Sequence, residues 1–170
     1  MPRRSRSLTG RRNEGVSVVA FSLAVLLLGS AAALALPAVR RAVTDHQREA
    51  TLDDLRRFAG SFQAYARDHG DWPSANFVPG RIPPGMEKYL ADSHWTQRSP
   101  IGGHYVWLRH TPQAGGRYAA AIAIVSSGES RVTNEREPLE GIDRAIDDGD
   151  LSAGSFFLGY HDYPVYILEH

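Results

Sequence analysis

Hydrophobic and charged positions are sharply separated at the start of the chain. The 24 residues from Val16 to Val39 carry no charge, and the 15 residues before them include Arg3, Arg4, Arg6, Arg11 and Arg12. As a helix rising about 1.5 Å per residue, the apolar stretch would be roughly 36 Å long, enough to cross a bilayer. Because basic flanks stay in the cytoplasm, we expect residues 40–170 on the opposite side of the membrane.

After this stretch the hydrophobic pattern acquires a helical period. Spacings of three, four and three residues separate Leu55, Phe58, Phe62 and Tyr65. This single apolar stripe predicts an amphipathic helix over residues 40–69, ending at the C-cap pair His69-Gly70. Thr44 with Gln47 fits a capping box and leaves open a helix that restarts there. We favour one long helix with an apolar first half and an amphipathic second half.

The rest of the chain alternates turn signals with strand-like runs. Residues 71–85 are rich in proline and glycine, and a short helix is expected at Met86–Leu90. His104–His110 alternates in polarity, Tyr118–Val125 is apolar, and glycines between them predict a β-hairpin.

Three further segments complete the expected layout. Pro138–Ile146 predicts a short helix with Pro138 at its first position. Phe156–Leu158 and Val165–Leu168 predict a second strand pair, with Pro164 suited to an edge. The sequence therefore predicts an α+β fold: a long N-terminal helix packed on a small antiparallel sheet.

Composition narrows the class of protein. The first 15 residues carry a net charge of +4 and the remainder a net charge of −4, which argues against nucleic acid as a partner. Cysteine is absent, which excludes disulfides and thiolate metal sites. The roughly 130 residues after the apolar stretch suffice for one modest domain.

Several segments together resemble a known family. They are the basic leader ending in Gly15, AALALPAV (32–39), LRRFAGSFQAYARDHGDWP (55–73), IPPGMEKYL (82–90) and SPIGG (99–103). This combination resembles the type IV pilin superfamily, and within it the pseudopilins of type II secretion. The resemblance implies cleavage by a prepilin peptidase between Gly15 and Val16, N-methylation of Val16, and a helix kink at Pro37.

The resemblance also implies an organisation and a role. Residues 1–15 would be the leader, 16–39 a single transmembrane helix of the inner membrane, and 40–170 a periplasmic pilin-like domain with helix 40–69 followed by loops and sheet over 70–170. The N-terminus would be cytoplasmic. The subunit would assemble with other pseudopilins through its N-terminal helix into a periplasmic pseudopilus for protein export. An inner-membrane platform and an assembly ATPase would be its further partners.

One position departs from the family pattern. Ala20 stands at the fifth mature position, where the family usually has a glutamate. A carboxylate in the bilayer core is costly unless paired, and pairing with a neighbouring N-terminal amine sets the stagger of subunits. With Ala20 that pairing is lost, which favours a tip position over the repeating shaft.

The acidic residues Asp143, Asp147, Asp148 and Asp150 cluster around Gly149. Carboxylates at a glycine turn suit calcium, and calcium in C-terminal loops is also implied by the resemblance. The spacing does not match an EF-hand. Asp147, Asp148 and Asp150 are our calcium candidates, with a solvated helix end and turn as the alternative; no other cofactor or metal is expected.

No motif predicts catalysis, so we expect no enzyme. There is no G-x-S-x-G, H-E-x-x-H or P-loop. The seven histidines are scattered, and the hydrophobic core accounts for the aromatic residues Trp72, Trp95, Trp107, Phe156 and Phe157.

Other functional classes stay open. An ordinary signal peptide, with an apolar region at Val16–Leu28 and a cleavage site at Ala33-Leu34-Ala35, would make this a secreted binding domain or enzyme. A minor type IV pilin and a plain single-span anchored protein are further alternatives.

Overall fold

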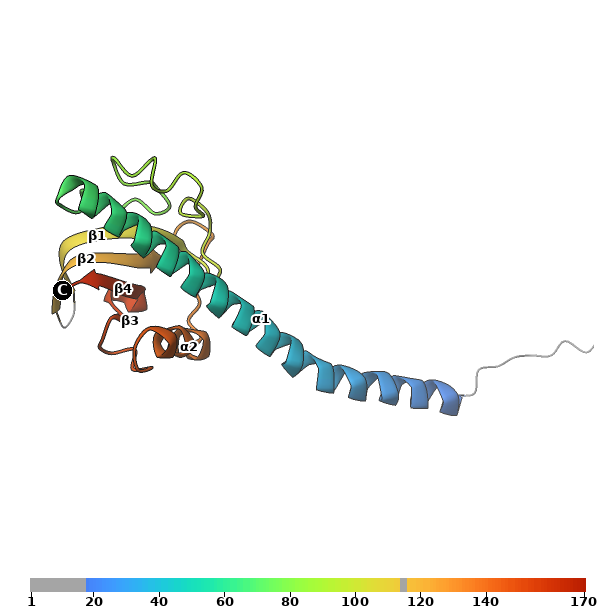
Figure 1. Cartoon of the computed structure of the whole chain (residues 1–170). Coiled ribbons are helices and arrows are strands. Elements are labelled where there is room, and N and C mark those ends of the chain that lie inside the picture. Colours follow the sequence, from blue (N-terminus) through green and yellow to red (C-terminus); the bar gives the residue numbers. More distant parts are fainter. Residues whose placement is uncertain (1–17, 114–115) are drawn as a thin grey trace, which may run out of the picture. The chain divides into compact units, whose positions relative to one another are not determined.

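A computed structural model describes residues 18–113 and 116–170 (Figure 1). Its elements are α1 (Val18–His69), β1 (His104–Gln113), β2 (Gly116–Val125), α2 (Arg136–Ile146), β3 (Phe156–Leu158), the 3₁₀ turn η1 (Tyr160–Asp162) and β4 (Pro164–Glu169). The fold is α+β, with one long helix packed on a four-stranded antiparallel sheet, as predicted. Contacts divide the chain into one unit that ends at Arg41 and a second unit, Ala42–His170.

Helix α1 runs without a break through the possible restart at Thr44, so that alternative is wrong. Alanine, arginine, glutamine and glutamate dominate residues 40–50, and these residues favour continuation of a helix. The predicted end is confirmed: α1 stops at His69, and Gly70 has φ +74° with its N–H 2.8 Å from the Ala66 carbonyl oxygen. Glycine adopts this left-handed C-cap without steric cost.

The expected transmembrane segment, residues 16–39, lies partly outside the described part of the chain, which leaves out residues 16 and 17 and several side chains between 19 and 35. Within the described residues, no helix combines the length and the apolar character needed to cross a membrane.

The sheet has the strand order β1-β2-β4-β3, and every pair is antiparallel. The predicted hairpin is confirmed: His104 pairs with Val125 and Gln113 with Gly116. The edge position predicted for Pro164 is wrong, because β4 lies between β2 and β3. Pro164 is instead the first residue of its strand, where a missing N–H is tolerated.

Two local predictions also need correction. Met86–Leu90 forms turns rather than a helix; the Leu90 N–H donates to the Met86 carbonyl at 3.0 Å, and the next bond, from the Ser93 N–H to the Leu90 carbonyl at 3.1 Å, closes a separate turn. Gly85, at φ +83°, interrupts helical geometry immediately before it. Helix α2 begins at Arg136, two residues before Pro138, which still lies in the first turn, where backbone N–H groups have no intrahelical acceptor.

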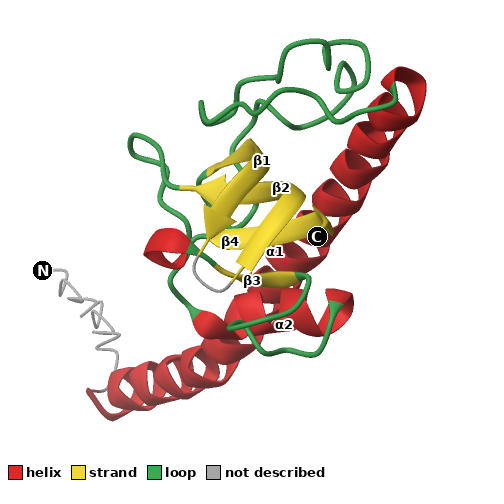
Figure 2. Ribbon diagram, turned by 90° about the vertical axis from the view of Figure 1, so that its left-hand side faces the viewer, coloured by secondary structure: helices red, strands yellow, loops and turns green. Residues whose placement is uncertain are grey.

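The main core lies between α1 and one face of the sheet (Figure 2). Leu55, Phe58 and Phe62 of the predicted stripe are fully buried. Phe62 stacks on Trp107 with ring centroids 3.9 Å apart, and Phe58 meets Tyr105 edge-on at 4.7 Å. Leu139 and Ile142 of α2 complete this cluster, whereas the other face of the sheet has a smaller one built from Val106, Leu108, Tyr118, Ala121, Ala123, Phe157 and Val165.

Candidate functional site

The predicted processing residues, Gly15 and Val16, lie outside the described residues. Ala20 and Pro37 both fall within α1. A kink at Pro37 is expected because proline removes one i→i−4 hydrogen bond from a helix. This kink stays a prediction.

Apolar side chains on the first part of α1 face solvent in the isolated chain. More than half of the surface is exposed for Phe21, Leu23, Val25, Leu26, Leu27, Leu36, Val39 and Val43. Between Leu52 and Phe62 the apolar side chains of the same helix are buried in the domain. A concentration of exposed apolar side chains of this kind is typical of a surface that contacts lipid or other proteins.

The acidic residues after α2 do not converge on a common point. Asp147 Oδ2 accepts the Ser155 N–H at 2.7 Å, and Asp148 Oδ1 accepts the Asp150 N–H at 2.8 Å. Asp150 Oδ1 accepts both the N–H and the hydroxyl of Ser152, at 3.0 and 2.6 Å. These bonds hold the loop, and the two from Ser152 lower the pKa of Asp150.

No group of three acidic or histidine side chains within the described residues could hold a metal ion. Calcium binding therefore stays a prediction, which calorimetric titration of the full chain with calcium would test.

Asp143 differs from its acidic neighbours because it is completely buried. It lies on the inner side of α2 beside Ile142, and neither carboxylate oxygen has a hydrogen-bond partner of normal geometry. Burial raises the pKa of Asp143, and the negative charges of Asp148, Asp147 and Asp150 add to this, although the Gly149 N–H acts in the opposite direction. An unpaired buried carboxylate costs stability.

A second buried carboxylate is paired. Asp54 of α1 accepts a hydrogen bond from the Tyr105 hydroxyl at 2.9 Å, and His94 Nδ1 lies 3.4 Å from its other oxygen. Burial, followed by the charge of Asp54, raises the pKa of Tyr105 far above its usual value. This contact joins α1, β1 and the loop between them.

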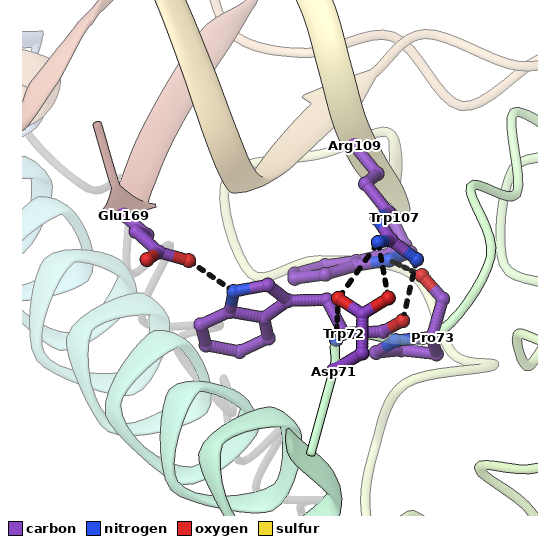
Figure 3. A network of polar contacts seen from close by, with 6 residues as sticks. All are labelled: Asp71, Trp72, Pro73, Trp107, Arg109 and Glu169. Carbon is purple, nitrogen blue, oxygen red and sulfur yellow. Dashed lines mark hydrogen bonds and ion pairs between the residues drawn. The ribbon is translucent and has the colours of Figure 1, made fainter. Parts of the chain in front are cut away.

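A polar network fixes the segment that leaves α1 (Figure 3). Arg109 of β1 donates to both oxygens of Asp71, at 2.7 and 2.6 Å, and to the Trp72 carbonyl at 2.7 Å. The Trp72 indole N–H donates to the Glu169 carboxylate, and the Trp107 indole donates to the Pro73 carbonyl at 3.0 Å. The bond from Arg109 holds the pKa of Asp71 below its usual value.

The partners in this network are 38 and 97 residues apart in sequence, so no local pattern could have predicted it. Only the Trp72-Pro73 stop signal pointed to this segment.

A shallow hollow of about 500 Å³ lies beside Trp72. Its walls come from the end of α1, the Asp71–Trp72 segment and Glu169. A second hollow, of about 450 Å³, lies between the start of α2 and η1.

Comparison with known proteins identifies no relative: no protein-family model, no curated protein and no solved structure matches the chain. The resemblance to pseudopilins therefore rests on the sequence motifs.

Proposed function

We propose that this chain is a structural subunit of the pseudopilin type, which assembles through its N-terminal helix. The observation that carries the proposal is the change in character along α1. The helix runs unbroken from Val18 to His69, with exposed apolar side chains in its first part and a buried stripe in its last part. The first part of α1 can therefore contact other subunits, while its last part packs in the domain.

The attachment of α1 to the sheet supports a mechanical role. Phe58 and Phe62 are fully buried against aromatic rings, and Asp54 bonds to Tyr105 of β1. The end of the helix is linked to the sheet through the Asp71–Arg109 ion pair. A displacement of the helix would be transmitted directly to the domain, because packed interiors resist deformation.

Maturation in this proposal follows the family pattern. A prepilin peptidase removes residues 1–15 and Val16 is N-methylated. Residues 16–39 then span the inner membrane, with residues 40–170 in the periplasm. The uncharged run 16–39 supports the membrane span, and the basic leader supports a cytoplasmic N-terminus.

Assembly would involve other pseudopilins, an inner-membrane platform and an assembly ATPase, in the service of protein export. Ala20 lacks the carboxylate that sets the stagger of a repeating shaft, which favours a position at the tip.

The N-terminal residue of the mature protein tests this proposal. We would express the full chain with a prepilin peptidase and determine the N-terminus in membrane and soluble fractions by mass spectrometry. A membrane-bound chain that starts at Val16 is expected. Gly15→Leu should abolish processing, whereas Gly10→Ala, a change elsewhere in the leader, should leave it intact.

A soluble chain that starts at Leu36 would overturn the proposal and favour a secreted binding domain or enzyme. Ala33-Leu34-Ala35 supports this alternative. The helical backbone across Ala35 and Leu36 argues against it, because a protease needs an extended chain at its cleavage site. A minor type IV pilin would share the start at Val16, and its retention by a pilus assembly system would distinguish it.

A further inference from the structure

The shallow hollow beside Trp72 has the chemistry of a ligand site that the assembly role does not use. Trp95 and Trp107 are completely buried, whereas Trp72 is partly exposed and lines the hollow. The Trp72 ring packs against the main core on one side, and its remaining surface is left for contact with a ligand. The part of the Trp72 ring that faces the hollow is therefore available to a ligand.

Trp72 is held rigidly in this position. Its backbone N–H donates to Asp71 at 2.8 Å, its carbonyl accepts from Arg109 at 2.7 Å, and its indole N–H donates to Glu169 (Figure 3). Its ring also lies against Trp107, with centroids 5.7 Å apart. A side chain fixed in this way loses little conformational freedom when a ligand binds.

Planar polar side chains line the same hollow as the Trp72 ring. Gln63 and Arg67 lie one turn apart on α1, and neither makes a hydrogen bond or ion pair with another described side chain. They present amide and guanidinium donors together with an amide acceptor. Glu169, whose carboxylate accepts the Trp72 indole N–H, also lines the hollow.

The charges around the hollow balance. Arg67 and Arg109 are positive, while Asp71 and Glu169 are negative, and Asp71 is neutralised by its ion pair with Arg109. Arg67 is the one cation among the described lining residues and shares the hollow with two carboxylates, so the hollow offers little affinity for a phosphate or another anion. The open shape also excludes the enclosure that a long apolar ligand requires.

We propose that this hollow binds a neutral oligosaccharide. A sugar ring has an apolar C–H face, which suits the indole of Trp72, and an edge of hydroxyl groups, which suits Gln63, Arg67 and Glu169. An open hollow accommodates an internal stretch of a saccharide chain. The proposal does not depend on prepilin processing, so either can fail without the other.

The test uses the full chain in a detergent without a sugar headgroup, such as an alkylphosphocholine. Cellohexaose, chitohexaose and maltohexaose serve as three neutral probes. We expect at least one of them to change the tryptophan emission, because the other two indoles are shielded from solvent. Calorimetry supplies the affinity independently of fluorescence.

Arg67→Ala should weaken binding about tenfold, the effect of losing one or two hydrogen bonds. Trp72→Phe should abolish the emission change and weaken binding measured by calorimetry. Arg57→Ala, at an exposed arginine of α1 outside the hollow, is the matched control and should bind as the wild type does. Circular dichroism verifies that each variant is folded.

Three results would overturn the proposal. The first is the absence of binding by all three hexasaccharides, and the second is equal affinity of the Arg67→Ala and Arg57→Ala variants. The third is an emission change that depends on protein concentration without sugar, which would make the hollow a contact between protein chains.

Discussion

At the scale of single residues, two carboxylates are buried away from water, and they differ in their hydrogen bonds. Asp54 receives a hydrogen bond from Tyr105, whereas no described group forms a hydrogen bond of normal geometry with the Asp143 carboxylate. The sequence contains a signal for the second, since Asp143 lies four residues after Leu139 and so falls on the same, inner face of α2. Proximity in sequence alone places Asp143 with its acidic neighbours instead. The partner of Asp54, 51 residues away, had no such signal.

Asp143→Asn should stabilise the protein at neutral pH. The pKa of Asp143 is raised in the folded state, so its contribution to stability is complete below the unfolded pKa and is lost as pH rises through the folded pKa. The variant should be more stable than the wild type near pH 7, and this gain should shrink as the pH falls. Denaturant unfolding at several pH values measures it, with the exposed Asp92→Asn as control. A gain that is independent of pH would contradict the prediction.

Tyr105→Phe should destabilise the protein by roughly 1–3 kcal/mol, because it leaves the buried oxygen of Asp54 without its donor. Tyr166→Phe is the control, because the Tyr166 hydroxyl makes no hydrogen bond with the described residues; it should change stability little. Equal effects of the two variants in chemical denaturation would count against a role for the Asp54 contact.

At the scale of elements, the helices and strands were predictable where their periodicity was strong. The stripe from Leu55 to Phe62 is buried as expected, and the hairpin and the second strand pair form at the predicted places. The turns between them were less predictable, because their conformation depends on contacts distant in sequence. Gly102 illustrates this: a Cβ there would lie 2.0 Å from the carbonyl oxygen of Arg131.

Gly102→Ala should therefore cost about 3 kcal/mol or more, since both the contact and the left-handed backbone oppose a side chain. Gly128→Ala is the matched control, because Gly128 also has a positive φ, +57°, but open space around its Cβ position. That control should cost only about 1 kcal/mol. The melting temperatures of the two variants compare these costs. Similar decreases in melting temperature would argue that contact with Arg131 is unimportant.

At the scale of the whole molecule, the predicted α+β arrangement is confirmed, whereas the links that hold it together were not foreseen. The Asp71–Arg109 pair and the Trp72–Glu169 hydrogen bond join segments far apart in sequence. Such links appear only when the fold is known. The packing of α1 on the sheet followed from the amphipathic pattern, since an apolar stripe must find an apolar face.

Phe62→Ala should weaken the attachment of α1 to the domain by roughly 3–5 kcal/mol, because Phe62 is fully buried against Trp95 and Trp107. Phe21→Ala removes the same side chain from an exposed position of the same helix and should leave domain stability within about 0.5 kcal/mol. Denaturant unfolding of the full chain in detergent compares them. Equal losses would contradict the division of α1 into an exposed part and an anchoring part.

The interior position of β4 has a consequence for the order in which the domain forms. β3 precedes β4 in the chain, and among the described strands it pairs with β4 alone, which also completes the pairing of β2. While the polypeptide is emerging, β1 and β2 can form their hairpin, but β3 must wait until residues 164–169 have appeared. A ribosome or translocation channel that still holds residues 164–169 therefore leaves the sheet with only the β1–β2 pair, and the sheet is completed once these residues are free to pair.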